Sequence, residues 1–567
     1  MEESAHPGRG TGGGVALFAV AGLLVTVWAY LPGMGAGFYF DDLTNLVDDP
    51  ALHWTELSTA ILWRTATDAH LPLRWVANAT FGLNHLLFGL SPESYHWTNL
   101  ILHLLTGAVL AWVAWLYLGR SAAVAGRRGA AAMLVAVIFL VHPLNTQAVT
   151  YVIQRMTVLA ALLCLTSFGL YLWARDPGAT RRRRRVGFVL SVAAWVLAVF
   201  SKENSVALPL VAGAYEASFH GRAWLAVARR AWASSRTRWT LVTAGAAAGV
   251  VGAVALERLA SRGLVSLTVD LQARDFSGVE RLLTEGRVHW LYVSLLGWPA
   301  PSRLTLDHDV EVSRGLLTPW TTLPAIVLWL LVAGAAVRLA RRRPLWGFPL
   351  VAYLVLHAIE SGPISLELAF EHRMYLPLAA LSLMGAVALA GLGSPARSGA
   401  RLFAHGVPLA AVGVAVAVVV VLAVGTHERN RTWGDSLTFH ADTAAKAPGK
   451  YRPVYNYGTA LGKAGRLSDA ERVLRQAVAV GPERAEAHNQ LGNVYLFSGR
   501  AALAVGEYET ALRLDPEHPE AVYNLARRYE ALGRAAEARA LDRRFVAIAP
   551  WYLEAQRRAV AARLGGP

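Results

Sequence analysis

Two adjacent carboxylates, Asp41 and Asp42, stand shortly after the first apolar segment of the chain, and three aromatic residues (38–40) precede them. A positioned carboxylate can act as a general base and take the proton of an acceptor hydroxyl. Ionisable groups beside a bilayer are costly to keep there, which marks them as functional candidates. An Asp pair can also simply open a solvated loop, so its interpretation depends on the rest of the chain.

Cations occur in short polar clusters at the ends of several later apolar segments. Arg155, Lys202 and Arg373 each lie in such a cluster, and His372 directly precedes the last of them. An arginine can hold a phosphate through two parallel hydrogen bonds, and a lysine acts as a point charge. We predict that these four residues bind a lipid phosphate. Two residues of the same clusters are expected to support them: Glu203 and His142. Taken singly, such clusters also occur as helix caps and interfacial anchors.

The composition is that of a membrane protein. Of the 567 residues, 54% are hydrophobic and 16% are charged, whereas soluble domains carry about 25% charged residues. Several apolar segments are shorter than the roughly 20 residues that a span needs, so longer or tilted helices are expected. Together they predict an all-α, polytopic bundle of about eleven spans in residues 1–426, near 15–34, 97–118, 130–143, 156–174, 186–200, 205–219, 240–257, 320–339, 345–359, 375–392 and 407–426.

Basic residues gather in five loops between these segments: 120–128, 175–185, 222–238, 338–343 and 397–401. With eleven spans all five loops lie on one side, which the positive-inside rule makes cytoplasmic. The net charge of +15 is then a signal of topology rather than of nucleic-acid binding. We expect the Asp pair and the C-terminal part on the opposite side, the periplasmic side of a bacterial inner membrane.

Two long loops are expected on that opposite side. Residues 35–96 are too apolar for a free loop and predict helices lying on the membrane surface. The second loop, 258–319, contains an apolar run at 290–299 that is too short to span, so it predicts an interfacial or re-entrant helix. The single cysteine, Cys164, excludes an intramolecular disulfide.

A period of 34 residues marks a C-terminal domain at 427–567. Prolines recur at this interval, at 448, 482, 516 and 550, and glycines recur at 465, 499 and 533. This period, with helix–turn–helix patterning, predicts tetratricopeptide repeats: three full repeats at about 449–550, a partial unit at 432–447 and a capping helix at 551–563. Such arrays present a concave groove, which suits a protein or peptide acceptor. The simpler alternative is an assembly surface without a peptide ligand.

The ordered motifs resemble those of integral-membrane glycosyltransferases of the GT-C fold. The closest resemblance is to the tetratricopeptide-bearing transmembrane O-mannosyltransferases and their bacterial relatives. It adds Arg74, His96 and Asp307 to the expected supporting residues. Family members often have Arg-Pro-Leu where this chain has Leu-Pro-Leu-Arg at 71–74, so Arg74 departs from the family pattern. The resemblance rests on Asp41-Asp42, Leu73-Arg74, 95–99 with His103, His142-Pro143, Gln154-Arg155, 201–203, Leu306-Asp307 and 372–377.

The resemblance implies transfer of a sugar, mannose or another hexose, from a polyprenyl-phosphate donor to Ser or Thr hydroxyls of a protein. An inverting transfer needs one base rather than two flanking carboxylates, and positioned cations stabilise the leaving phosphate. We predict Asp41 as the base, with Asp42 orienting or assisting it. The lipid-linked donor is the one cofactor-like molecule expected. Metal participation stays open: Asp307, His308 and Asp309 could supply ligands, but a solvated loop is the simpler interpretation.

Two other functional classes fit the same sequence. One is a non-catalytic membrane scaffold whose repeats recruit partners. The other is a transporter of polyprenyl lipids. A scaffold should tolerate Asp41→Asn, and a transporter should move lipid without any protein acceptor.

Overall fold

The structure, a computed structural model, describes residues 11–125, 127–233, 276–362, 366–391, 409–550 and 553–565. Every named element in these ranges is a helix, which agrees with the predicted all-α class. The chain forms two compact units. The first comprises Met1–Leu304 and Val310–Arg431, and the second comprises Thr305–Asp309 and Thr432–Pro567. The domain boundary expected at 426/427 stays a prediction.

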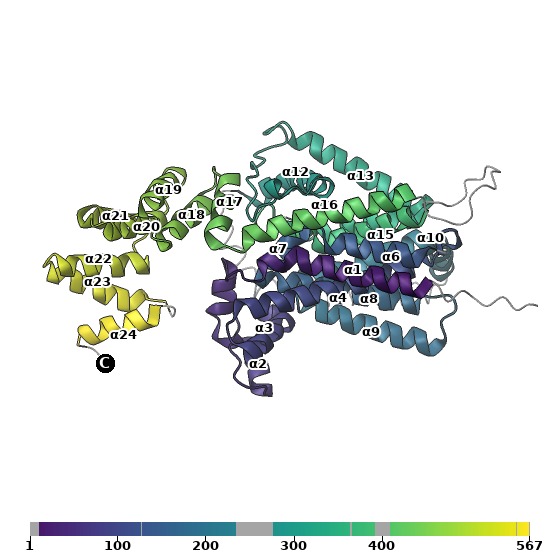
Figure 1. Cartoon of the computed structure of the whole chain (residues 1–567), viewed down its shortest axis with the longest axis horizontal. Coiled ribbons are helices and arrows are strands. Elements are labelled where there is room, and N and C mark those ends of the chain that lie inside the picture. Colours follow the sequence, from purple (N-terminus) through teal and green to yellow (C-terminus); the bar gives the residue numbers. More distant parts are fainter. Residues whose placement is uncertain are drawn as a thin grey trace, which may run out of the picture. The chain divides into compact units, whose positions relative to one another are not determined.

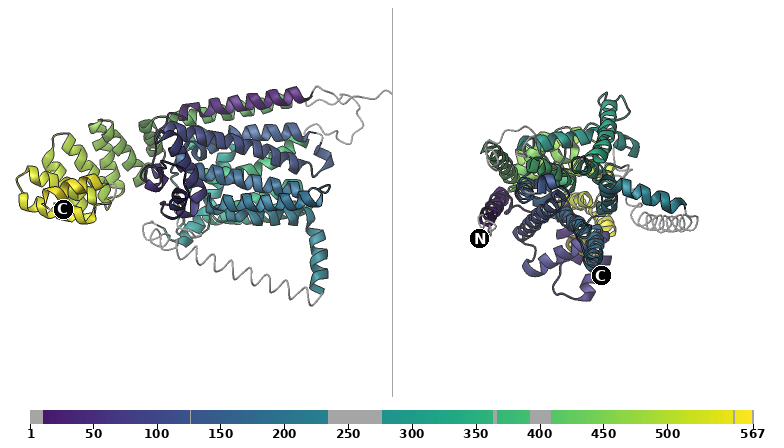
Figure 2. Two further views of the ribbon diagram at one scale, coloured as in Figure 1. Left: turned by 90° about the horizontal axis from the view of Figure 1, so that it is seen from below. Right: turned by 90° about the vertical axis from the view of Figure 1, so that its right-hand side faces the viewer.

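The first unit is a helical bundle in which several long helices run side by side, as two views show for α1, α4, α8 and α9 (Figures 1 and 2). The long helices are α1 (Thr11–Tyr30), α4 (Pro92–Leu118), α6 (Arg128–Leu140), α8 (Arg155–Ala174), α9 (Arg181–Val199), α10 (Leu208–Ala233), α12 (Gly278–Gly297), α13 (Thr322–Arg342), α14 (Pro344–His357), α15 (Tyr375–Gly391) and α16 (Leu409–Trp433). Shorter elements at their ends include η2 (Leu43–Val47), α2 (Thr59–Thr67), α3 (Trp75–Phe88), η5 (Pro143–Asn145), α7 (Thr146–Thr150), η6 (Val152–Gln154), η7 (Glu203–Ala207) and η9 (Glu371–Met374).

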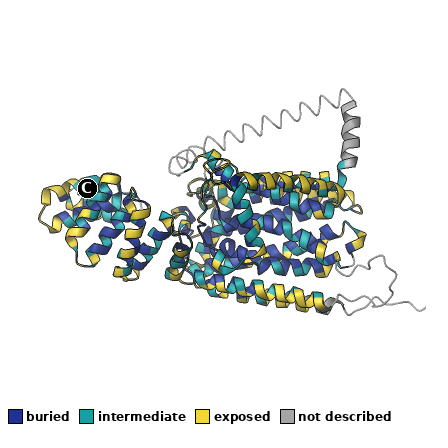
Figure 3. Ribbon diagram, turned by 90° about the horizontal axis from the view of Figure 1, so that it is seen from above, coloured by how far each residue is buried: buried dark blue, intermediate teal, exposed yellow. Residues whose placement is uncertain are grey.

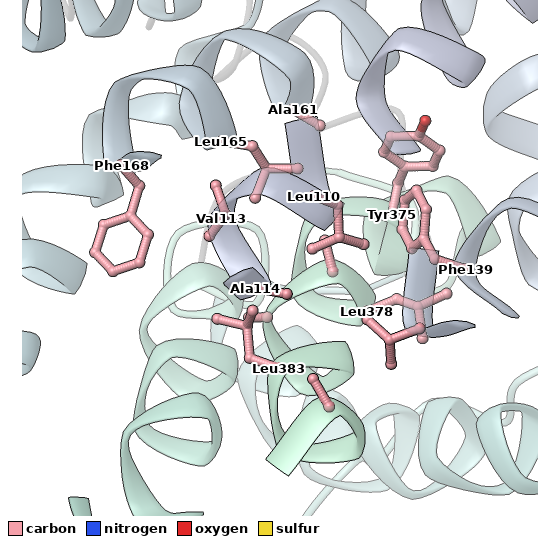
Figure 4. Packing of buried hydrophobic residues seen from close by; sticks show 14 of the residues in the cluster. Leu110, Val113, Ala114, Phe139, Ala161, Leu165, Phe168, Tyr375, Leu378 and Leu383 are labelled. Atoms are coloured by element: carbon pink, nitrogen blue, oxygen red, sulfur yellow. The ribbon is translucent and has the colours of Figure 1, made fainter. Parts of the chain in front are cut away.

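The core of this unit lies where α4, α6, α8 and α15 meet. Leu110, Leu165, Phe139 and Leu383, one from each helix, are among its buried residues (Figure 4). Small residues let neighbouring backbones approach closely. At Gly347 of α14 a Cβ atom would lie 2.0 Å from the backbone nitrogen of Ala340 in α13. Any larger residue there would force these two helices apart.

Apolar side chains also cover the outside of the bundle. The most apolar window of α16 has a mean hydropathy of 2.3 with 11% of it buried, and that of α13 has 2.1 with 17% buried. Both helices carry many exposed residues, and the buried residues lie inside the bundle (Figure 3). Apolar surface of this extent marks contact with lipid rather than water. The chain is a multi-pass membrane protein.

The predicted count of eleven spans is not confirmed. Among the described residues, five helices are long and apolar enough to span, or six if the pair Arg128–Leu140 and Pro143–Thr150, bent by 55°, counts as one. The segments near 15–34 and 345–359 form shorter apolar helices, Leu17–Gly33 and Pro344–His357. Helix α9 begins with five arginines, which leave fewer apolar residues than a span requires. The segment 240–257 lies outside the described residues.

The two predicted surface loops contain helices. In the first loop, Trp63 of α2 is 73% exposed to solvent, and Leu57, two residues before this helix, is 67% exposed. Helix α3 begins beside the end of α9, because the Val76 N–H donates to the Phe200 carbonyl at 3.1 Å. In the second loop, the run at 290–299 is the end of the longer helix α12 rather than a short helix of its own. Contact of these helices with the membrane surface stays a prediction.

The second unit contains the repeats as paired helices. Its helices are α17 (Ser436–Lys446), α18 (Tyr451–Lys463), α19 (Leu467–Val480), α20 (Ala485–Phe497), α21 (Ala501–Leu514), α22 (Pro519–Ala531), α23 (Ala535–Ile548) and α24 (Glu554–Arg563). Gly465, Gly499 and Gly533 separate the two helices of each repeat with φ of 73°, 75° and 74°. Residues with a side chain rarely adopt this conformation. The turn geometry thus explains why glycine recurs every 34 residues.

Candidate active site

The acidic pair lies in a turn just before η2, and its two carboxylates have different surroundings. Asp42 is fully buried. Its carboxylate accepts backbone hydrogen bonds from Tyr39 at 2.9 Å and from Ile153 at 2.7 Å. Burial raises the pKa of Asp42 to about 8, although these two N–H donors oppose the shift. Through these two hydrogen bonds Asp42 fixes the shape of the turn.

Asp41 is exposed and is the carboxylate of the pair that a substrate can reach. Its backbone N–H donates to the Tyr151 hydroxyl at 3.0 Å. The preceding residue, Phe40, has a φ of 48°, a left-handed conformation that costs a bulky residue about 1–3 kcal/mol. Strain of this kind concentrates at functional sites. The strained turn places adjacent residues in opposite environments, with Asp42 inside and Asp41 outside.

Arg155, predicted as a phosphate ligand, is held by neutral partners in the structure. The side chain is fully buried and all three guanidinium nitrogens donate to neutral acceptors. The partners are Asn99 Oδ1 at 2.7 Å, Asn84 Oδ1 at 2.8 Å and the carbonyls of Thr80 and Tyr95 at 3.0 and 3.1 Å. A phosphate could bind only by displacing these contacts. Arg155 is a positioning residue that holds the first loop against α8.

Lys202 and Glu360 form a buried ion pair. Lys202 Nζ lies 3.4 Å from Glu360 Oε1 and donates to Thr157 Oγ1 at 2.9 Å. Asn204 adds an amide hydrogen bond to the same Glu360 oxygen at 3.0 Å. Burial lowers the pKa of Lys202, and the charge of Glu360 acts against the shift. Lys202 is therefore a cation with a resident counter-ion, next to the start of α8.

Arg373 lies in a second buried group, together with Glu285. Its Nη1 donates to the Leu368 carbonyl at 3.2 Å and lies 4.0 Å from Glu285 Oε1. The ion pair is at the outer limit of contact, so an incoming anion could replace it. Burial raises the pKa of Glu285 to about 7, while the charges of Arg281 and Arg373 act against the shift.

Arg281 of α12 holds the other side of Glu285. Its Nη2 lies 2.9 Å from Glu285 Oε1 and donates to the Glu360 carbonyl at 2.7 Å. Its other nitrogens donate to the carbonyls of Leu366, at 3.1 Å, and Gly362. Arg281 therefore ties α12 to the segments that carry Glu360 and Arg373.

Two further predicted residues join this cationic cluster. Arg74 Nε donates to both oxygens of Glu203, at 2.9 and 3.1 Å. The backbone N–H of His372 donates to Gln147 Oε1 at 2.8 Å. The charges of Lys202, Arg373 and Arg74 all act on His372, which places these four side chains within electrostatic reach of one another.

One short segment, Tyr151–Thr157, contacts both groups of charged residues. The Tyr151 hydroxyl accepts a hydrogen bond from the Asp41 N–H, and the Ile153 N–H donates one to the Asp42 carboxylate. Met156 Sδ accepts from Arg74 at 3.3 Å, and Thr157 accepts from Lys202. The acidic turn, Arg74 and Lys202 therefore all contact the segment that starts α8, and the charge of Arg373 acts on Lys202. Binding of a phosphate by these cations stays a prediction.

Two predicted supporting residues, His96 and His142, make contacts outside this cationic cluster. His96 is buried and its Nε2 lies 3.0 Å from the Ala36 carbonyl, so it anchors the chain ahead of the acidic turn. His142 caps η5 by accepting from the Leu144 N–H at 3.2 Å. Both are structural contacts rather than open ligand positions.

Asp307, another predicted supporting residue, belongs to the second unit and not to the first, which contains the cationic cluster. It is buried there and pairs with Lys450 Nζ at 2.9 Å and Arg452 Nη2 at 2.6 Å. These two cations lower the pKa of Asp307 against the opposing effect of burial. The carboxylate is thus committed to the repeat unit. Within the described ranges, no group of three His, Cys, Asp or Glu side chains is arranged to hold a metal ion.

A small apolar cavity of about 30 Å³ lies inside the first unit. Leu208, Leu356 and Leu376 line it, as does Cys164 of α8. The three leucines follow or precede Lys202, Glu360 and Arg373 by only a few residues on α10, α14 and α15. The cavity therefore lies between helices whose ends are close in the chain to Lys202, Glu360 and Arg373.

Three charged residues of this region were not predicted from the sequence: Arg281, Glu285 and Glu360. A signal for the first two was present, because Arg281 and Glu285 stand four residues apart and Tyr292 seven further along, which places all three on one helical face. Glu360 gave no comparable signal, since a lone acid after an apolar helix is common. Its importance depends on Lys202, which is 158 residues away in the chain.

A family model of the tetratricopeptide repeat matches residues 455–507 and 489–550, which confirms the predicted repeats. Protein O-mannosyl-transferase TMTC3 of Mus musculus is 30% identical over 203 residues, 34% of this chain and 21% of that protein. Protein O-mannosyl-transferase Tmtc3 of Drosophila melanogaster is 25% identical over 546 residues, 86% of this chain and 58% of that protein. The crystal structure of ArnT from Cupriavidus metallidurans bound to undecaprenyl phosphate is similar over 94% of this chain and 80% of that chain, with 15% identity and a TM-score of 0.36.

Fold and repeats together define a multi-pass helical membrane protein with a C-terminal tetratricopeptide array. The chain is similar in sequence to the TMTC3 and Tmtc3 protein O-mannosyl-transferases, in agreement with the resemblance of its motifs. It spans 21% and 58% of the lengths of the two relatives described.

Proposed function

We propose that this chain is a membrane glycosyltransferase that moves a sugar from a polyprenyl-phosphate donor to a Ser or Thr hydroxyl of a protein acceptor. The observation that carries the proposal is that the segment Tyr151–Thr157 contacts both the acidic turn with its exposed Asp41 and the cations Arg74 and Lys202. Lipid-linked transfer needs a base for the acceptor and positive charge for the leaving phosphate. Relatives named as protein O-mannosyl-transferases support the same class and make mannose the first sugar to test.

Asp41 is the proposed base. The acceptor hydroxyl gives its proton to Asp41 while its oxygen forms a bond to the anomeric carbon of the sugar. The bond from that carbon to the phosphate oxygen breaks, and the electron pair stays on the phosphate. Asp42 positions the turn, since it is buried and bonded to two backbone N–H groups.

Lys202 and Arg373 are the proposed ligands of the donor phosphate, with His372 and Arg74 nearby. Both cations are buried, so their interaction with an anion is screened less by water than at a surface. Leu208, Leu356 and Leu376, a few residues from these charged groups along the chain, are proposed to contact the first isoprene units of the donor.

The repeats are proposed to recruit the acceptor polypeptide. Helix–turn–helix repeats stack into arrays with extended concave surfaces. Holding a polypeptide near the site raises the local concentration of its hydroxyl groups without any new contact at Asp41. This role requires that Asp41 and the repeats share the non-cytoplasmic side, as the distribution of basic loops predicts.

The test is transfer of labelled mannose from a polyprenyl-phosphate donor in reconstituted vesicles, to a protein acceptor and to a short Ser/Thr peptide. Wild-type protein should label both acceptors, and Asp41→Asn should label neither. The matched control is Asp48→Asn, which changes a half-buried carboxylate six residues after Asp42 in the same loop and should retain activity. Full activity of the Asp41 variant would refute the base. Lipid movement without any transfer to acceptor would point to a transporter instead.

A further inference from the structure

The three cations nearest the proposed phosphate position already face carboxylates. Arg74 pairs with Glu203, Lys202 with Glu360, and Arg373 with Glu285. The last contact is the longest, at 4.0 Å. A donor phosphate on Arg373 would therefore bring a second anion against Glu285. Two anions that share one cation disfavour each other's charged form.

We propose that Glu285 takes up a proton when the donor phosphate binds to Arg373. The inference deepens the proposed function, because it rests on donor binding at this cluster. In the empty site the Glu285 carboxylate is a counter-ion of Arg373 and Arg281. In the occupied site the phosphate replaces it on Arg373, and one proton from solvent neutralises the acid. No other bond is made or broken.

The geometry favours Glu285 over Glu360 as the proton acceptor. Glu360 accepts a hydrogen bond from Asn204 and lies 3.4 Å from Lys202, so its charged form keeps the Asn204 amide even when the phosphate shares Lys202. Arg281, the closer cation to Glu285, also divides its nitrogens among three backbone carbonyls. Glu285 is 2% exposed, so water cannot compensate for the loss of Arg373. Burial has already raised its pKa to about 7, which is the range where uptake is measurable.

The charged and titratable groups around Glu285 come from three elements. Arg281 and Tyr292 lie on its own helix, Glu360 follows α14, and Arg373 belongs to η9. His357 lies within reach of Arg373 and of His289, which is one turn along α12. A histidine that gained a proton would also strengthen anion binding at low pH. The experiment must therefore separate a carboxylate from these two imidazoles.

The probe is methyl farnesyl phosphate, a phosphodiester that keeps one negative charge between pH 5 and 9. Its binding to the purified full-length protein is measured by calorimetry from pH 6 to pH 8, in two buffers with different ionisation enthalpies. If bound Glu285 is always protonated, affinity should fall about tenfold between pH 6 and pH 8. Proton uptake should be about half a proton per probe at pH 7 and should approach one at pH 8.

Glu285→Gln should bind the probe with an affinity that stays nearly constant over this range, and its proton uptake should vanish. Glu311→Gln is the matched control, because Glu311 is an exposed acid of the same loop region, 3.8 Å from Arg287; it should keep the wild-type profile. A pH profile that persists in Glu285→Gln would assign the proton to a histidine and overturn the inference. A profile lost in Glu360→Gln but kept in Glu285→Gln would also overturn it.

The wild-type measurement stands even if a variant fails to fold. Binding without any proton uptake would refute the inference and leave the proposed donor site intact. Absence of binding at every pH would refute the donor site itself, and with it the part of the proposed function on which the inference rests.

Discussion

Replacing Asp42 by asparagine preserves the size of the side chain but removes one of its two hydrogen-bond acceptors. Both carboxylate oxygens of the wild-type residue accept a backbone N–H, one from Tyr39 and one from Ile153. The asparagine amide can accept one and must turn its NH₂ group toward the other. A buried donor left without a partner costs about 1–3 kcal/mol. We expect Asp42→Asn to lower the free energy of unfolding by this amount, with the turn and its transfer activity disturbed together.

The pH dependence gives an independent check. Burial raises the pKa of Asp42 from 3.8 to about 8, so between these values the folded protein binds a proton that the unfolded chain has released. Stability contributed by this group is therefore fully present below pH 3.8 and falls as pH rises toward 8. Asparagine has no proton to lose, so the variant should lack this part of the pH dependence.

The assay is thermal unfolding in detergent at several pH values, run beside mannose transfer. Asp41→Asn serves as the comparison, because Asp41 is exposed and its side chain should matter little to folding. It should melt like the wild type while transfer falls about 10²–10⁴-fold, the usual contribution of a general base. If Asp42→Asn melts like the wild type at every pH, the assignment of Asp42 as a buried positioning carboxylate is refuted.

Four further outcomes are expected. Arg373→Ala should weaken donor binding about tenfold to a hundredfold, from a lost contact of about 1.5–3 kcal/mol; Arg373→Lys should restore only part of it, and unchanged binding would remove Arg373 from the site. Truncation after residue 448 should impair transfer to protein more than transfer to peptide, and equal losses would refute recruitment by the repeats. The truncation removes both cations that neutralise Asp307, so it is combined with Asp307→Asn. Cys164→Trp should overpack the small apolar cavity beside α8 and lower the melting temperature, because extra volume in a packed core is destabilising; an unchanged melting temperature would contradict this packing. A cysteine at 498 should react with an impermeant thiol reagent in intact cells and one at 178 should not, and the reverse pattern would invert the topology.

Much of this architecture could be predicted from local patterns. The repeats follow from a 34-residue period, because each helix–turn–helix unit uses the same small residues and the same left-handed glycine at the same place. The membrane class follows from composition, since a bilayer selects apolar helices directly. The number of spans was not predictable in this way. Helix ends and bends depend on packing, as the break at residues 140–143 illustrates.

The candidate site also has features that the sequence predicted and features that only the tertiary structure decided. The adjacent carboxylates and the polar ends of apolar segments were visible as motifs, and the structure places the acidic turn and Lys202 against one segment, Tyr151–Thr157. Sequence could not say which carboxylate is buried, because that depends on an Ile153 N–H 111 residues away. Nor could it show that Arg155 is fully used by neutral partners. The amino-acid sequence by itself determined which charged residues are present. The tertiary structure alone decided which of them are paired, because these side chains meet only after the helices have packed.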